Sequence, residues 1–147
     1  MRRAMWVLGV AALVMSGYAA GRAQQKAIDS SVVSAAQSTL AENAAWGRFH
    51  AYYEGATPGT AAMLFGTAEV NPGFENHPPH KHADEEVLCL KEGTLEAYED
   101  GQTTRVGPGS VLFFASNHLH GVKNVGTTPA TYFIVKWNSP GMLKKKN

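Results

Sequence analysis

Short strand-like segments separated by strong turn signals constrain the fold of this chain more than any other feature of its sequence. Asn71-Pro72-Gly73, Asp100-Gly101 and Gly107-Pro108-Gly109 each combine residues that set or permit the dihedral angles of tight turns. The segments between the turns are rich in aromatic and β-branched residues, and no window after the N-terminal region shows helical periodicity. We therefore predict an all-β sandwich or barrel. The predicted strands are 46–53, 62–70, 94–99, 103–106, 110–114, 121–125 and 131–137.

Length, charge and cysteine content limit the domain count and the kinds of partner. The chain has 147 residues and a formal net charge of +1, so it has room for one domain with a proper core, and a nucleic-acid partner is disfavoured. Cys89 is the single cysteine, which excludes an internal disulfide and a cysteine-based zinc cluster within one chain. We expect Cys89 to be a buried, inert thiol.

The N-terminus has the layout of a secretory signal peptide. Arg2 and Arg3 precede a short apolar run and then a series of small residues, and cleavage after Ala20 or after Ala23 fits this layout. The apolar run is short for a membrane span, although an uncleaved membrane anchor is the alternative. We expect a periplasmic or secreted protein with no stable membrane span after processing. The predicted divisions are a signal peptide at 1–23, a linker and N-terminal arm at 24–45, a barrel at 46–140 and a basic tail at 141–147.

Two histidines and a glutamate in the middle of the chain predict part of a metal site. His80, His82 and Glu86 share the same parity, so on one continuous strand their side chains would all point to the same face. Leu88 and Leu90 have that parity too, which makes this face the interior. Imidazoles and a carboxylate are suitable ligands for divalent metal ions. A fourth ligand must come from elsewhere in the chain.

The glycines, histidines and glutamate of this region resemble the two sequence motifs of the cupin superfamily. The residues that resemble the first motif are Gly73, His80, His82, Glu86 and Gly93. The residues that resemble the second motif are Gly101, Pro108, Gly109, His120 and Asn124. The resemblance implies a small single-domain cupin, whose fold is a double-stranded β-helix, a jelly-roll-like barrel, at 46–140.

The same resemblance implies the ligands, the cofactor and the assembly. The implied metal ligands are His80, His82, Glu86 and His120. The implied cofactor is a divalent metal ion, and the ligand types suit iron, manganese, nickel or zinc without choosing among them. The implied partners are a small-molecule ligand or substrate and a second copy of the chain in a homodimer.

Other polar residues are weaker candidates, and no residue is assigned as catalytic. His118 has the parity of His120 and is a candidate for contact with substrate or with the surroundings of the metal. Asn124 is expected to cap backbone groups near the rim of the barrel, with an inward contact as the alternative. His50 is expected to be packed or hydrogen-bonded rather than catalytic, and His77 is expected at the surface or rim.

The sequence favours an enzyme without determining its reaction. The first hypothesis is a metal-dependent, dioxygenase-like oxygenase or related oxidoreductase that acts on a small organic molecule. One alternative is a non-catalytic module that binds a metal or small ligand. Another is an isomerase or lyase in which the metal acts as a Lewis acid. The fold cannot separate these hypotheses, because function depends on the site.

Overall fold

The strands of this protein form two antiparallel sheets that face each other, as expected for an all-β fold. The computed structural model describes residues 27–139, so the predicted signal peptide at 1–23 and the basic tail at 141–147 lie outside the described residues. Within the described part, no helix is long and apolar enough to cross a membrane. The elements are η1 (Ala35–Gln37), β1 (Thr39–Ala44), β2 (Gly47–Gly55), β3 (Ala62–Val70), β4 (Glu85–Glu92), β5 (Leu95–Glu99), β6 (Gln102–Val106), β7 (Val111–Phe114), β8 (His120–Asn124) and β9 (Ala130–Asn138).

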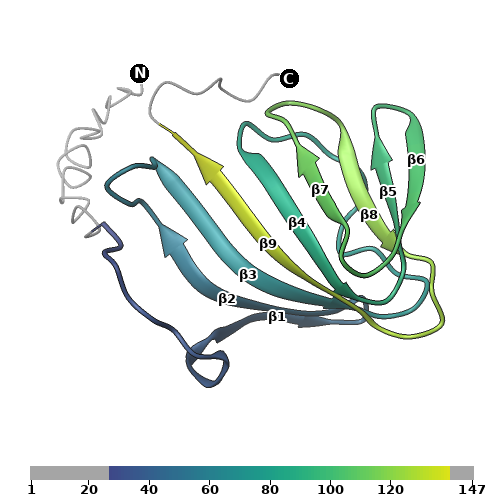
Figure 1. Cartoon of the computed structure of the whole chain (residues 1–147), viewed down its shortest axis with the longest axis horizontal. Helices are drawn as coiled ribbons and strands as arrows, with labels where there is room; N and C mark the ends of the chain where they lie inside the picture. Colours follow the sequence, from purple (N-terminus) through teal and green to yellow (C-terminus); the bar gives the residue numbers. More distant parts are fainter. Residues whose placement is uncertain (1–26, 140–147) are drawn as a thin grey trace, which may run out of the picture.

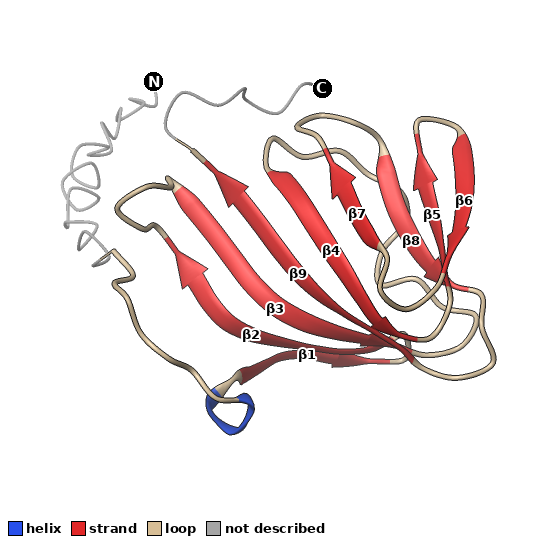
Figure 2. Ribbon diagram, viewed as in Figure 1, coloured by secondary structure: helices blue, strands red, loops and turns tan. Residues whose placement is uncertain are grey.

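The larger sheet has the strand order β1-β2-β3-β9-β4-β7, and the smaller sheet has the order β6-β5-β8. Figures 1 and 2 show the large sheet curving so that the β4 and β7 side faces the small sheet. β9 is the last strand of the described residues but pairs with both β3 and β4, near the middle of the large sheet. β1, within the predicted arm, pairs with β2 along a fully exposed strand.

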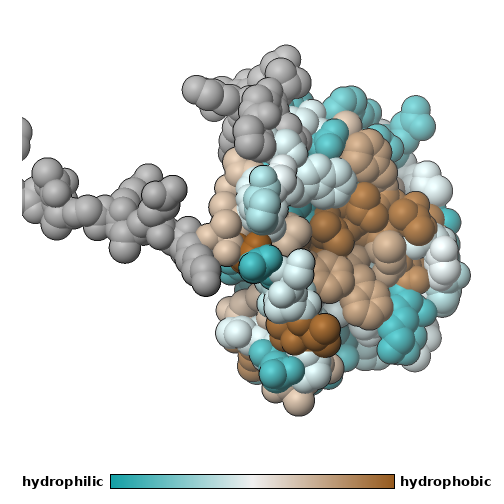
Figure 3. All heavy atoms as spheres, turned by 60° about the vertical axis from the view of Figure 1, so that its left-hand side comes forward, coloured by the Kyte–Doolittle hydropathy of each residue, from teal (hydrophilic) through white to brown (hydrophobic). Residues whose placement is uncertain are grey.

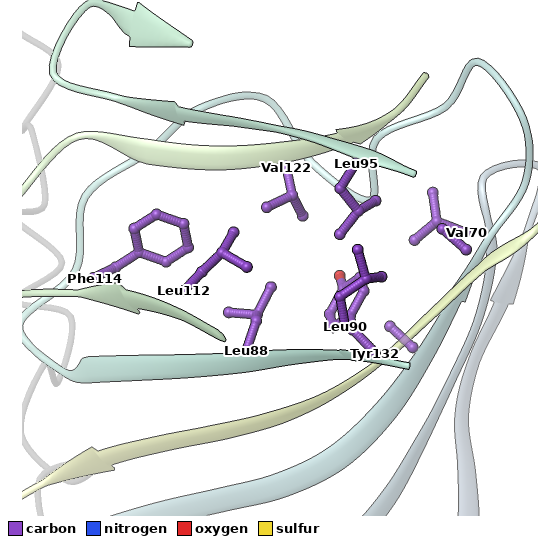
Figure 4. Packing of buried hydrophobic residues seen from close by; sticks show 10 residues of the cluster. Val70, Leu88, Leu90, Leu95, Leu112, Phe114, Val122 and Tyr132 are labelled. Atoms are coloured by element: carbon purple, nitrogen blue, oxygen red, sulfur yellow. The ribbon is translucent and has the colours of Figure 1, made fainter. Parts of the chain in front are cut away.

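The hydrophobic core lies between the two sheets (Figure 4). Leu88 and Leu90 of β4 point inward from the large sheet and are almost completely buried, as their parity predicts. Leu95 and Val122 approach them from the small sheet. Two polar residues, Glu86 and His120, lie at the other end of the interior and are also buried.

Part of the outer face of the large sheet, over β4, β7 and β9, is apolar as well. Side chains of opposite parity to the core face outward, and Val111, Phe113 and Phe133 among them are 68%, 53% and 38% exposed. Figure 3 shows apolar side chains gathered in one area of the molecular surface. Cys89 lies on this outer face, paired in register with Val111 and Phe133. It is exposed, so the prediction of a buried thiol is wrong, because its parity directs it away from the core.

Candidate metal centre

A cluster of three histidines lies at one end of the space between the sheets. His80, His82 and His120 each offer a ring nitrogen, and these three atoms all lie within 4.8 Å of one another. Glu86 is next to them, with its Oε2 atom 3.2 Å from Nε2 of His82. The structure therefore brings together the four residues predicted as metal ligands.

The continuous strand that predicted this convergence does not exist. β4 begins at Glu85, and residues 81–84 form no strand. His80 instead forms an isolated antiparallel bridge with His120, in which each backbone N–H donates to the other's carbonyl oxygen at 2.9 and 3.0 Å. The bridge places the two imidazoles side by side, with ring centroids 4.9 Å apart. His82 reaches the cluster from the loop that follows His80. The backbone carbonyl of His82 accepts a hydrogen bond from the backbone N–H of Asn117 at 2.8 Å.

Backbone carbonyls fix the orientation of two of the imidazoles. Nδ1 of His120 lies 2.9 Å from the carbonyl oxygen of His118, and Nδ1 of His82 lies 2.9 Å from that of Asp84. Since a carbonyl can only accept, each Nδ1 carries the proton, and each Nε2 of the neutral ring keeps its lone pair. Such bonds hold metal-ligating histidines in one tautomer.

The polar atoms that face the interior fit a bound cation. Nε2 of His120 and Nδ1 of His80 are buried and have no hydrogen-bond partner among the described residues. Nε2 of His82, once Nδ1 holds the proton, presents a lone pair to the Glu86 carboxylate. Two acceptors facing each other at this distance need a proton or a cation between them. The donor set of imidazoles and one carboxylate suits a divalent transition metal.

The electrostatics keep the cluster ready to accept positive charge. Burial, together with the neighbouring His77, His120 and His82, lowers the pKa of His80 to about 4. Burial also lowers the pKa of His120. Burial alone would raise the pKa of Glu86, but the neighbouring His82, together with His120 and Lys136, holds it below its usual value. At neutral pH His80 and His120 are therefore neutral and Glu86 is ionised.

The fold and the histidine cluster agree with a comparison of the chain with known protein families. The family model of the cupin domain matches residues 66–136. The chain belongs to the cupin superfamily. That match includes all four residues of the candidate metal centre.

Two solved structures of other cupins share the fold. An RmlC-like cupin from Shewanella frigidimarina is 13% identical, with 77% of this chain and 95% of that chain covered and a TM-score of 0.60. The cupin domain of Cnp3 from Schizosaccharomyces pombe is 17% identical, with 63% and 64% covered and a TM-score of 0.56. A predicted oxalate decarboxylase from Thermotoga maritima is 25% identical, with 51% and 65% covered and a TM-score of 0.49. This chain thus spans less than two thirds of the last two proteins. A search of the curated proteins finds no match.

Three cavities surround the cluster of this cupin. The space beside Glu86 and His120 inside the barrel is about 20 Å³, no more than one water-sized position. Phe114 stacks on His120 with ring centroids 4.4 Å apart and also lines a cavity of about 500 Å³ between β7 and the small sheet. On the other side, Asp84 and Lys136 line a cavity of about 390 Å³.

His118 lies beside the cluster but faces outward. Its side chain is half exposed, and Nδ1 lies 2.8 Å from Oδ2 of Asp100. The other carboxylate oxygen of Asp100 accepts from the backbone N–H of Leu119 at 3.0 Å. These two hydrogen bonds lower the pKa of Asp100. His118 thus contributes a carbonyl to His120, while its imidazole and Asp100 hold the loop in place.

The structure does not bring Asn124 or His50 to the cluster. Asn124 is completely buried at the opposite end of β8, where its amide donates to the carbonyls of Val70 and Thr128 and accepts from the N–H of Gly126. It caps backbone groups, as expected. His50 pairs in register with Thr67, and its Nδ1 lies 3.1 Å from Oγ of Ser38. His50 is therefore a hydrogen-bonded residue at the outer face of the large sheet.

His77 approaches the cluster more closely than the sequence suggested. Its ring meets that of His80 edge-on, with centroids 4.1 Å apart, and it lines the small interior cavity. It remains exposed, in agreement with a position at the rim. Sequence reasoning missed this contact, although the short spacing of His77, Pro78, Pro79 and His80 limits how far the two rings can separate.

Proposed function

We propose that this cupin binds a divalent metal ion through His80, His82, Glu86 and His120. The observation that carries this proposal is the convergence of buried, unpartnered imidazole nitrogens beside an ionised carboxylate. Leaving such atoms buried without partners costs roughly 1–3 kcal/mol each. A bound cation offsets that cost.

The activity that we propose is a metal-dependent oxygenase or related oxidoreductase acting on a small organic molecule. A bound transition metal would supply redox chemistry or polarise an oxygen atom of the substrate. Glu86, buried and ionised beside His82, is placed to accept a proton from a bound molecule. Cavities of about 390 and 500 Å³ flank the cluster and are large enough for small molecules. An isomerase or lyase would use the same residues with the metal as a Lewis acid.

A non-catalytic binding module is the second candidate function. The observation that favours it is the space of only about 20 Å³ between the described residues around Glu86 and His120. A site this tight can hold a metal ion but leaves no room for a substrate beside it. A substrate would have to enter from one of the larger flanking cavities.

Metal analysis followed by an oxygen-uptake screen tests the proposal. Protein purified from its native compartment is expected to contain about one equivalent of a divalent metal. Small phenolic and keto-acid compounds are then screened for oxygen consumption. Glu86→Gln is expected to abolish uptake, whereas Glu85→Gln, the matched change at the neighbouring outward position, leaves it intact. Purified protein without metal would refute the metal site, and metal without uptake or turnover would favour the binding module.

We further propose that the mature protein is extracytoplasmic and homodimeric. The signal-like layout of residues 1–23 supports the location, and fractionation of cells that express the tagged chain tests it. The apolar part of the outer face of the large sheet, with the exposed Val111, Phe113 and Phe133, supports the dimer, since an exposed apolar patch marks a site of contact with another protein.

A further inference from the structure

A charged cavity adjoins the candidate metal centre on its β9 side. It has a volume of about 390 Å³, and the charged residues that line it are Glu54, Asp84 and Lys136, with Leu64 and Met63 among the apolar ones. It belongs to the same end of the barrel as the cluster, because β2 ends, and β3 and β4 begin, at that end.

Strand register places Lys136 directly beside the cluster. Lys136 is opposite Glu86 on one side and opposite Leu64 on the other. Residues that are directly opposite point to the same face, so its side chain shares the inner face with Glu86. Its charge also contributes to the lowered pKa of Glu86. Asp84 connects the cavity with the cluster as well. It lines the cavity, and its backbone carbonyl accepts a hydrogen bond from Nδ1 of His82.

The ammonium of Lys136 has no partner of its own. It is partly buried, and the ion pairs formed by residues 27–139 do not include it. Elsewhere on the surface, Arg48 is paired with Glu69 at 2.8 Å. A partly buried cation that points into a cavity beside a metal centre is a place for an anionic group.

The other charged groups define the rest of the ligand. The carboxylate oxygens of Asp84 and Glu54 accept hydrogen bonds, so they complement hydroxyl groups. We propose that this cavity binds a small hydroxylated carboxylic acid, with its carboxylate at Lys136 beside the metal centre and its hydroxyls at Glu54 and Asp84. This inference rests on the proposed function and names its substrate class.

Calorimetry of the binding of small-molecule probes to zinc-loaded protein tests this assignment without depending on turnover. Zinc is chosen because it has no redox chemistry. The probes are D-gluconate, which has both groups, sorbitol, which has hydroxyls without a carboxylate, and hexanoate, which has a carboxylate without hydroxyls. Gluconate is expected to bind at least tenfold more tightly than either of the others.

Substitutions test which residue binds the carboxylate of the ligand and which binds its hydroxyl groups. Lys136→Met is expected to weaken gluconate binding about tenfold to a hundredfold, since a charged hydrogen bond is lost. Lys136→Arg restores most of the affinity, and Lys123→Met, at an exposed position of β8, changes nothing. Glu54→Gln weakens gluconate binding and leaves that of hexanoate unchanged.

Zinc content is measured in every sample. It distinguishes a failure of the proposed metal site from a failure of the proposed ligand. Wild-type protein that retains no zinc would overturn the proposed metal site and this inference with it. Zinc-loaded wild-type protein that does not bind gluconate, or that binds hexanoate equally well, would overturn this inference alone. So would a Lys136→Met variant that binds gluconate as tightly as the wild type.

Discussion

The candidate metal centre depends on how each histidine uses its two ring nitrogens. In His82 and His120 one nitrogen donates to a backbone carbonyl, so the other is held toward the interior. The carbonyls are those of Asp84 and His118, both within two residues of the histidine that they orient. The local chain therefore sets the direction of the lone pairs before any metal binds.

Removing one of these imidazoles should empty the centre without unfolding the barrel. His80→Ala or His120→Ala is expected to lower bound metal at least tenfold, because each deletes a ligand at a buried position. His50→Ala serves as the matched control, since His50 contacts Ser38 and not the cluster. Elemental analysis, with circular dichroism as a check on folding, measures the effect. Full metal occupancy in the His80 and His120 variants would refute the assignment of the ligands.

The lowered pKa of His80 predicts a pH-dependent stability. Its pKa is about 4 in the folded protein, against an ordinary value of 6.5. Between these values the unfolded chain binds a proton at this residue and the folded protein does not, so the free energy of unfolding decreases as the pH falls. Denaturation of the metal-free protein at pH 7 and pH 5 should show this loss. His80→Gln, which cannot titrate, should lose less, and an equal loss in both proteins would contradict the prediction.

At the scale of the elements, the turns and the crossing of strands decide where the site forms. Gly93, between β4 and β5, has a φ of +87°, and a Cβ atom there would lie 2.5 Å from Cα of Ala130. Gly101, in the turn between β5 and β6, has a φ of +97° but open space around it. Both glycines have a backbone conformation that is strained for any residue with a side chain, but only Gly93 is closely surrounded.

Alanine substitution at the two glycines separates backbone strain from steric conflict. Gly101→Ala is expected to destabilise the protein by about 1 kcal/mol through strain at positive φ. Gly93→Ala is expected to cost about 3 kcal/mol or more, because the new methyl group also displaces β9. Chemical denaturation measures both values. Equal losses would show that contact with Ala130 has no energetic role.

Much of the strand pattern could be predicted from the sequence, because the turns depend on local chemistry. The predicted strand 62–70 coincides with β3, and Asp100-Gly101 joins β5 to β6 as expected. The predicted strand through His80 and Glu86 was wrong, since residues 81–84 leave the strand. The histidines still reach the interior because the bridge to His120 holds them there, and that pairing is non-local. Local patterns carry no information about such a contact.

The outward residues show the same limit. Alternation correctly separated Leu88 and Leu90 from Cys89, but the apolar surroundings of Cys89 in the sequence suggested burial. Whether an apolar outer face is covered depends on partners, which parity does not reveal. The contact of His77 with His80 was missed for a related reason, because it depends on the path of a loop.

At the scale of the whole molecule, the outer face of the large sheet is suited to a second copy of the chain. Five strands from β2 to β7, with nine residues in each of the longest, give a face on the order of 700 Å² at ordinary strand spacings. A stable interface buries about 800 Å² on each partner. Two such sheets can stack face to face around a twofold axis.

A charge placed on this face should prevent the proposed dimer from forming. Phe133→Glu is expected to produce a monomer, because Phe133 lies in the middle of the face and a buried carboxylate is costly. Thr103→Glu, on an exposed position of the small sheet, is the control for the added charge. Light scattering after size exclusion measures the mass. A monomeric wild type, or a dimeric Phe133→Glu variant, would contradict the prediction.

The position of β9 has a consequence for the order in which the molecule is assembled. β9, the last strand within residues 27–139, is inserted between β3 and β4, and it places Lys136 beside Glu86. The large sheet cannot close until synthesis has passed residue 138, so folding depends on contacts between distant parts of the chain and is expected to be slow. Capture of the proposed metal is therefore expected to be a late event, and a chain interrupted before β9 would hold all four candidate ligands without the barrel that brings them together.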